Sequence, residues 1–177
     1  MTLQPHLPSI SALNILAPDE FAAALRLLFE AAGPLAEALY ASRPYASYED
    51  VIERAEALAH ELPIAQQIEV VNAHPRLGEN AAMVREQSAL SFREQGYDRE
   101  AGLPADEVQR VYAALAELNR AYEERFGFRF VVFVNQRPKA EIVELLRDRL
   151  PNSRAAELET ALGELFSIAR DRCQQLS

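Results

Sequence analysis

The amino-acid sequence predicts an all-α fold, a single domain of about seven to nine packed helices. Apolar residues recur every three or four positions along most of the chain, which is the spacing of one helix face. Proline and glycine interrupt this pattern at intervals typical of helix ends. The most apolar run, residues 126–134, has no clear partner strand elsewhere, and a lone strand would leave its backbone groups unpaired. We therefore expect this run to be a buried extended or partly helical segment whose amides face a ligand.

The composition excludes several classes of function. A chain of 177 residues with 49% hydrophobic and 25% charged residues is typical of one globular domain. The net charge of −9 argues against nucleic acid, because phosphate binding needs clustered lysine and arginine, and against an anionic membrane surface. The single cysteine, Cys173, excludes an internal disulfide and a cysteine-based zinc site.

The same sequence predicts a cytoplasmic protein. A single cysteine suits a reducing compartment. The N-terminus lacks the charged and apolar regions of a secretory signal, and no apolar run is long enough to span a bilayer. The C-terminal Gln-Gln-Leu-Ser is not a peroxisomal address. We therefore expect a small-molecule partner, and neither nucleic acid nor membrane.

The beginning of the chain divides into an arm and a helical domain. Residues 1–16 hold closely spaced proline and turn residues and are predicted to form an extended arm, which leaves residues 17–177 as the domain. Pro18 suits the first position of a helix, where Asp19 and Glu20 favour the positive end of the helix dipole.

Three more helices are expected before residue 74. A short one covers residues 35–40. Ser47 and Asp50 then resemble a capping box, and the helix behind them runs to about Leu62. Pro63 begins the next helix. The residues expected to face inward from it are Ile64, Ile68 and Val71.

The second half of the chain is predicted to hold four helices. Residues 80–88 show no clear pattern, whereas 89–100 and 105–126 show helical spacing. Two closing helices are expected over 138–150 and 153–173.

His74 is the histidine best placed for chemistry. Pro75 disfavours helical backbone for the residue before it, so His74 is expected at or just past a helix end. Gly78 allows a sharp turn two residues after Arg76. The stretch is suited to presenting an imidazole, beside an arginine, to a small anionic molecule. A packed core histidine before a helix-ending proline explains the same residues, and these residues alone favour that alternative.

A polar trio follows on the next predicted helix. Ser91, Glu94 and Gln95 lie at i, i+3 and i+4, hence on one helix face. Such a face is usually a solvated surface, and the trio by itself is more typical of that than of a site.

Arg172 continues the apolar stripe of the last helix. It is either an inward anion clamp or a cation whose head reaches water at the helix end. Adjacent helical residues diverge by about 100 degrees, so Asp171 is poorly placed to pair with Arg172. We expect its partner to be a substrate carboxylate or an acid such as Glu94, and we expect it to border one pocket with His74.

No motif for a metal or a cofactor is evident. The sequence contains no His-Glu-x-x-His, no phosphate-cradling Gly-rich loop and no Gly-x-Ser-x-Gly. His6 lies in the predicted arm and His60 on a polar helix face, so a multi-histidine metal site is not expected. We predict a cofactor-free site built from one histidine, one or two carboxylates and an arginine.

Four motifs follow one another along the chain. They are His74-Pro75-Arg76-Leu77-Gly78-Glu79; Ser91-x-x-Glu94-Gln95; Leu118-Asn119-x-x-Tyr122-x-x-x-Phe126-Gly127-Phe128-x-Phe130; and Arg149-Leu150-x-Asn152 followed by Glu157, Ala161 and Ile168-Ala169-x-x-Arg172. In order and spacing they resemble the decarboxylases of 2-oxo-4-hydroxy-4-carboxy-5-ureidoimidazoline (OHCU), which act in urate breakdown. The resemblance covers residues 15 to 172.

The resemblance implies an all-α, cofactor-free and usually homodimeric enzyme that converts OHCU to (S)-allantoin. It implies that His74, as general acid or base, and Glu94 carry the catalysis. The substrate-binding residues that we predict are Pro75, Ser91, Gln95, Phe128, Phe130, Val131, Val132, Phe133 and Arg172. Some relatives are fused to the preceding hydrolase of the pathway, and we do not expect that domain within these 177 residues.

A second hypothesis comes from a different class. The chain would then be a non-catalytic helical interaction module or a catalytically lapsed relative, with His74 and Arg172 as structural residues and the polar trio on the surface. An assay for optically active allantoin discriminates between the two hypotheses.

Overall fold

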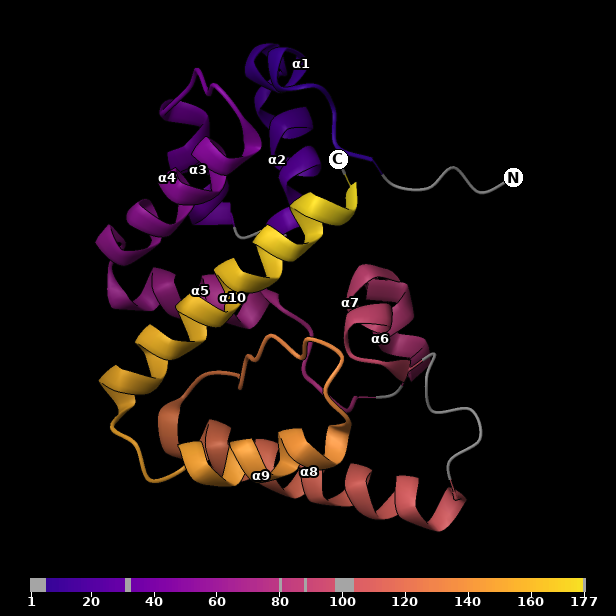
Figure 1. Cartoon of the computed structure of the whole chain (residues 1–177). Coiled ribbons are helices and arrows are strands. Elements are labelled where there is room, and N and C mark those ends of the chain that lie inside the picture. The colour runs from indigo at the N-terminus through magenta and orange to yellow at the C-terminus, as the bar shows by residue number, and fades with distance from the viewer. Residues whose placement is uncertain (1–5, 31–32, 80, 88, 98–103, 177) are drawn as a thin grey trace. The chain divides into compact units, whose positions relative to one another are not determined.

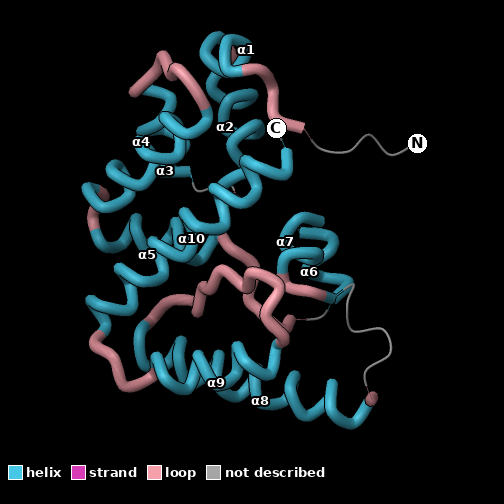
Figure 2. Tube along the Cα trace, in the orientation of Figure 1, coloured by secondary structure: helices cyan, strands magenta, loops and turns pink. Residues whose placement is uncertain are grey.

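The computed structural model describes residues 6–30, 33–79, 81–87, 89–97 and 104–176. Within these ranges the chain forms ten α-helices joined by loops, and no strand (Figures 1 and 2). The all-α class is therefore confirmed, and the number of helices is slightly above the expected seven to nine.

The helices gather into two compact units. Unit 1 contains residues 1–74 and 162–177, and unit 2 contains residues 75–161. The boundary between His74 and Pro75 falls inside the first motif, and the last helix contributes to both units.

Unit 1 contains the first five helices and the C-terminal part of the last. Their bounds are α1 Ile10–Ile15, α2 Pro18–Phe29, α3 Gly33–Ala41, α4 Tyr48–Glu61, α5 Ile64–Ala73 and α10 Arg154–Leu176. In this unit α3 packs against α2, α4 and α5. Phe29 of α2 meets Phe166 of α10 edge to face, with 5.9 Å between the ring centroids.

The predicted extended arm is wrong for residues 10–15, which form α1. The Ser9 hydroxyl accepts a hydrogen bond from the Ala12 N–H (3.2 Å) and so caps this short helix. Leu13 is fully buried. A helix of six residues is unstable by itself, so burial of its apolar side chain in the rest of the unit supports it.

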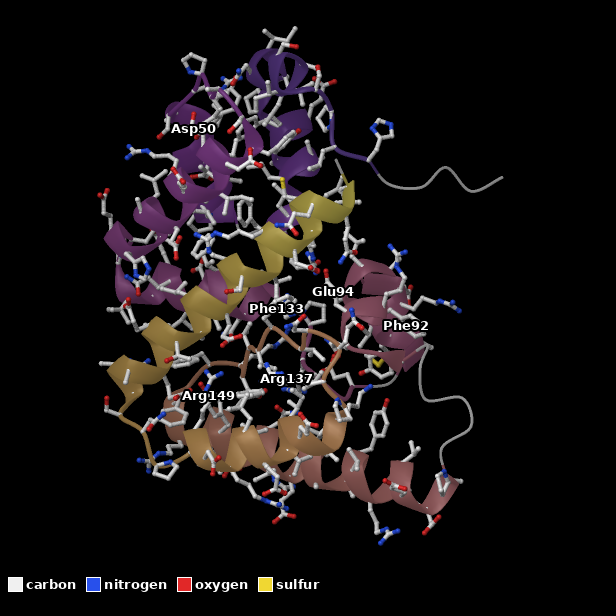
Figure 3. The ribbon with its side chains drawn as sticks, in the orientation of Figure 1. Asp50, Phe92, Glu94, Phe133, Arg137 and Arg149 are labelled. Atoms are coloured by element: carbon white, nitrogen blue, oxygen red, sulfur yellow. The ribbon has the colours of Figure 1, made fainter. Side chains whose placement is uncertain are left out.

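The predicted starts of two helices are confirmed. Pro18 is the first residue of α2, and the Ser47 hydroxyl accepts a hydrogen bond from the Asp50 N–H (3.1 Å) at the start of α4. The Asp50 carboxylate, labelled in Figure 3, accepts from the N–H of Ala46 (2.9 Å) and not from that of Ser47. The capping box is therefore displaced by one residue.

The helix α5 begins after Pro63 and Val71 faces inward, both as expected. Its buried residues are Gln67, Val70 and Val71, whereas Ile64 is 53% exposed. The Gln67 amide donates to the carbonyls of His60 (3.2 Å) and Leu62 (2.9 Å), which ties α5 to the end of α4. The expectation that Ile64 faces inward is wrong, since Ile64 is the first residue of α5, at an end of the helix where Pro63 and Ala65 are exposed as well.

Unit 2 contains the remaining helices. Their bounds are α6 Ala81–Gln87, α7 Ala89–Glu94, α8 Ala105–Phe126 and α9 Lys139–Arg149, together with the first turns of α10. α6 packs against α7, and α8 against α9. The helix predicted over 89–100 ends at Glu94, because Gly96 takes a left-handed conformation (φ 77°); residues 98–100 lie outside the described ranges.

A buried polar network crosses unit 2. Arg149 Nε (2.8 Å) and the Tyr122 hydroxyl (2.5 Å) both donate to Glu157 Oε2, and Asn152 Nδ2 donates to Oε1 (2.7 Å). Burial by itself raises the pKa of Glu157, but these three hydrogen bonds outweigh it and hold the pKa below its ordinary value. Arg149 Nη1 also donates to the Val131 carbonyl (2.9 Å), so the network anchors the apolar run.

Candidate active site

His74 lies at the C-terminal end of α5, as expected. Its backbone is extended (φ −72°, ψ 135°), and its N–H donates to the Val71 carbonyl (3.2 Å). The side chain is 6% exposed. The following Pro75 is also buried, so the corner of the chain is fixed by the proline ring and by packing.

The turn after His74 is confirmed, but Arg76 does not present itself to an anion. Gly78 has φ 78°, and a Cβ there would lie 3.0 Å from a Leu115 side-chain atom, so any other residue would be strained and crowded. Arg76 binds both carboxylate oxygens of Glu123 (2.6 and 2.7 Å) and Oε1 of Glu79 (2.9 Å). The hydrogen bond to Glu123 raises the pKa of Arg76. Its charge is already compensated, so the arginine beside His74 holds the turn against α8.

The polar trio is not the solvated surface that its spacing alone favoured. Ser91 is fully buried, Gln95 is 3% exposed, and Glu94 is partly exposed at the end of α7 (Figure 3). Two of the three residues are therefore inward, and Gln95 directly follows the end of α7. Gln95 Nε2 donates to the Pro75 carbonyl (3.3 Å), which brings the second motif to the first.

The side-chain oxygen of Gln95 is a hydrogen-bond acceptor that a ligand could use. Its Nε2 is engaged with Pro75, whereas Oε1 is buried and has no hydrogen-bond partner among the described residues. A buried acceptor without a donor costs about 1–3 kcal/mol. A ligand N–H group placed at Oε1 would recover that cost.

The apolar run is a buried loop, as expected, and no strand. Phe128, Phe130, Val131 and Val132 are buried, and Phe133 is partly exposed. Arginine side chains bind its carbonyls: Arg149 that of Val131 (2.9 Å) and Arg137 that of Phe133 (2.6 Å). Figure 3 labels Phe133 and both arginines. That its amides face a ligand stays a prediction.

Arg172 points inward, as its stripe predicted, and its protein partner is Glu30. The guanidinium is 1% exposed and lies 2.6 Å from Glu30 Oε1. It also approaches the Leu28 carbonyl (3.5 Å). Asp171 instead accepts from the Gln175 amide (2.6 Å), which agrees with the divergence of adjacent helical residues. An acid partner was expected, but the sequence did not point to Glu30, which follows the end of α2 and has no local pattern linking it to α10. A further contact with Glu94 stays a prediction.

Sequence reasoning missed Lys139. It is the first residue of α9 and is only 9% exposed. Its Nζ donates to the main-chain carbonyl of Gln95 (2.8 Å). The signal was present, because Lys139 shares one helical face with the apolar Ile142, Val143 and Leu146.

Metal-binding clusters and membrane-spanning helices are both absent from the described residues. Within them, no group of three or more His, Cys, Asp or Glu side chains is arranged to hold a metal ion. None of the described helices combines the length and the apolar character needed to cross a bilayer.

Comparison with known proteins identifies the family. The family model for OHCU decarboxylase matches residues 14–174, which include all four motifs. The chain belongs to the OHCU decarboxylase family. The predicted enzyme class is thereby confirmed: the chain is a decarboxylase, a lyase, of urate degradation.

Individual OHCU decarboxylases are similar over most of the chain. The enzyme of Amia calva is 31% identical over 164 residues, which cover 93% of this chain and 91% of that protein. A uric acid degradation bifunctional protein of Bacillus sp. (strain TB-90) is 29% identical over 167 residues, and the chain spans only 32% of its length. A crystal structure of OHCU decarboxylase in the presence of (S)-allantoin matches with TM-score 0.63 and 26% identity, covering 86% of this chain and 95% of that one.

Proposed function

We propose that this chain decarboxylates OHCU to (S)-allantoin without a cofactor, with His74 as general acid and base. The observation that carries the proposal is the hydrogen bond from Gln95 to the carbonyl of Pro75 (3.3 Å). Through it, the residue next to Glu94 is held against the residue next to His74. Family membership supplies the reaction class, and the solved relative crystallised in the presence of (S)-allantoin supplies the product.

The reaction needs little from the protein beyond binding and proton transfer. When the bond from C4 to the carboxylate breaks, its electron pair forms a C4=C5 double bond while the C5=N π pair moves to nitrogen, which takes a proton. Carbon dioxide leaves, and the product is an enol. Loss of the hydroxyl proton and protonation of C5 on one face then give allantoin of one hand. The substrate is its own electron sink.

His74 is suited to the proton transfers. An imidazole exchanges protons near neutral pH, so one side chain can remove the hydroxyl proton and return a proton to carbon. The corner formed by α5 and Pro75 fixes the backbone that carries it. Burial to 6% exposure limits water, which would otherwise deliver protons to either face.

The second motif supplies hydrogen-bond acceptors. OHCU carries ureido and ring N–H groups, and we assign them to Gln95 Oε1 and the Glu94 carboxylate. Gln95 Oε1 is a buried acceptor with no partner among the described residues. A carboxylate accepts stronger, charge-assisted hydrogen bonds than a neutral group, so Glu94 is the larger contributor. The Ser91 hydroxyl and the amides of residues 128–133 are assigned to carbonyl oxygens, and Arg172 to the carboxylate.

The test is production of optically active allantoin. Urate is supplied with urate oxidase and the hydrolase of the pathway, and circular dichroism follows allantoin with and without this chain. The parent chain should speed the signal above the spontaneous reaction and give one enantiomer, in the presence of EDTA as well. A signal no faster than the spontaneous one would contradict the proposal and favour a non-catalytic helical module.

His74→Ala tests the catalytic assignment. It should lower the rate by about 10² to 10⁴, the usual contribution of a positioned acid or base. His60→Ala is the matched control, because His60 is exposed on α4. Near-parental turnover in His74→Ala would remove the role assigned to this histidine. A homodimer and a cytoplasmic site of action remain predictions.

A further inference from the structure

Lys139 stands where a positive charge is unfavourable. It begins α9, and the N-terminus of a helix carries a partial positive charge that repels a cation. Its side chain is 9% exposed, so water solvates the ammonium group poorly. Local structure therefore disfavours this residue on two counts, and its compensation has to come from tertiary contacts.

The compensation comes from the turn after α7 and from α8. Nζ donates to the main-chain carbonyl of Gln95 (2.8 Å). It lies 4.2 Å from the centre of the Tyr97 ring and 5.5 Å from that of Tyr112. An aromatic face attracts a cation at such distances, more strongly when the cation is desolvated. Lys139 thus joins the start of α9 to the residues that follow Glu94.

The turn after α7 needs such support. α7 has six residues, too few for a helix that is stable in isolation. The Gln95 side chain is held on Pro75, and the Tyr97 hydroxyl donates to the Glu79 carbonyl (2.8 Å). These bonds fix two side chains of the turn. The bond from Lys139 fixes its main chain, at the carbonyl adjoining Gly96, the residue with the most backbone freedom.

We propose that Lys139 is a positioning residue for the reaction: by holding the Gln95 carbonyl, it sets the place of the Glu94 carboxylate and the Gln95 amide. This inference rests on the proposed function, in which both groups bind the substrate. Lys139 itself acts through the turn and needs no contact with OHCU. Its loss should therefore reduce catalysis without a comparable loss of folding.

Two substitutions of Lys139 separate charge from packing. Lys139→Met keeps an unbranched apolar stem between the two tyrosine rings but removes the donor and the charge. Lys139→Arg keeps both, and a cavity of about 320 Å³ lined in part by Lys139 and Tyr112 leaves room for the larger head group. Arg147→Met is the matched control, since it removes one cation from an exposed position of the same helix.

The first measurement is kcat/KM for allantoin formation, well below the melting temperature of each variant. Lys139→Met should lose on the order of ten- to a hundredfold, as expected when binding groups shift by about an ångström. Lys139→Arg should recover most of the loss, and Arg147→Met should match the parent. Each loss of kcat/KM is also expressed as a free energy. The sum of the losses in Lys139→Met and Gln95→Ala should exceed the loss in the double variant, because the two residues act through one turn.

The second measurement is hydrogen exchange of the amides of residues 93–97. These include Gln95 N–H, bonded to the Ser91 carbonyl (2.9 Å), and Gly96 N–H, bonded to that of Arg93 (3.0 Å). Exchange should be faster in Lys139→Met and unchanged in Arg147→Met.

The outcomes separate this inference from the proposed function. An active parent with kcat/KM of Lys139→Met within twofold, or with strictly additive losses, would overturn the role of Lys139 and leave the function standing. An inactive parent would overturn the function and the catalytic consequence together. Even with an inactive parent, faster hydrogen exchange in Lys139→Met would support the conclusion that Lys139 stabilises the turn after α7. Unchanged exchange would refute that conclusion.

Discussion

Two buried arginines, one in each unit, are compensated in different ways. In unit 2, Arg149 shares Glu157 with Tyr122 and Asn152 and also binds a carbonyl of the apolar run. Tyr122, Arg149 and Glu157 are buried in unit 2, and Asn152 joins them from an exposed position. We therefore interpret the network as scaffold, which holds the apolar run at the Val131 carbonyl.

In unit 1, Arg172 pairs with Glu30, which lies at a helix end. Glu30 caps α2 in a left-handed conformation (φ 54°), which costs a residue other than glycine about 1–2 kcal/mol. The Glu30 side chain is 11% exposed, against 0% for Glu157. A carboxylate on a strained, slightly exposed backbone position is easier to displace than one locked in a network.

The contrast shows that burial alone does not assign a role to an arginine. Arg149 and Arg172 are both almost inaccessible. What separates them is the partner: a carboxylate bonded three times in unit 2, and a carboxylate at a helix terminus in unit 1. We assign Arg149 to stability and Arg172 to binding of the substrate carboxylate, and the following predictions test that division.

The largest effect is expected from Glu157→Gln. It leaves the Arg149 guanidinium buried without a countercharge, and breaking a buried pair in this way costs about 3–5 kcal/mol. Urea denaturation should show this loss, while the exposed control Glu159→Gln should stay near the parent. A cost below about 1 kcal/mol would show that the network is no scaffold.

The same network predicts an acid dependence. The pKa of Glu157 in the folded protein lies below its ordinary value of 4.5, so its contribution is complete above that pH and is lost as pH falls below it. The unfolding free energies of the parent and of Glu157→Gln should therefore converge as the pH falls below 4.5. If the difference between the two unfolding free energies did not change with pH, Glu157 would not stabilise the fold as a hydrogen-bonded carboxylate.

Glu30→Gln should be less damaging than Glu157→Gln. Water can reach its partly exposed carboxylate, so we expect a loss of about 1–2 kcal/mol by denaturation. If Glu30 competes with the substrate for Arg172, the same variant should lower KM. An unchanged or higher KM would show that Glu30 does not compete with the substrate and that its role is structural.

Lysine substitutions compare the two arginines directly. Arg172→Lys keeps the charge but loses the planar fork, and should lower kcat/KM about tenfold, equal to about 1.4 kcal/mol of binding in the transition state. Arg149→Lys should instead lower the melting temperature and leave kcat/KM per folded enzyme near the parent. If Arg149→Lys lowered kcat/KM and Arg172→Lys lowered only the melting temperature, Arg149 would be the binding residue and Arg172 the structural one.

The smallest effect is expected at the surface. Arg110 pairs with Asp106 one turn earlier on α8 (2.9 Å), and both side chains are more than 70% exposed. Arg110→Met should change the unfolding free energy by less than about 0.5 kcal/mol. A larger change would mean that the costs at Glu157 and Glu30 cannot be attributed to burial.

The sequence by itself determined much of the helical frame. Pro18, Ser47 and Gly127 mark helix ends through their own backbone and side-chain preferences, which act within a few residues. The apolar period, with Pro104 before it, placed α8 at about its observed bounds, and the order of the four motifs indicated the family. Such signals are local or additive along the chain, so they can be recognised without the structure.

The tertiary structure decided which polar groups meet. The bonds Gln95–Pro75, Lys139–Gln95, Arg172–Glu30 and Arg149–Glu157 join residues that are 20, 44, 142 and 8 positions apart. It also buried Ser91 and Gln95, which their spacing assigned to the surface, and made a helix of residues 10–15. These outcomes depend on which faces the helices bury against one another. That choice is a sum over many long-range contacts, and no short stretch of sequence contains it.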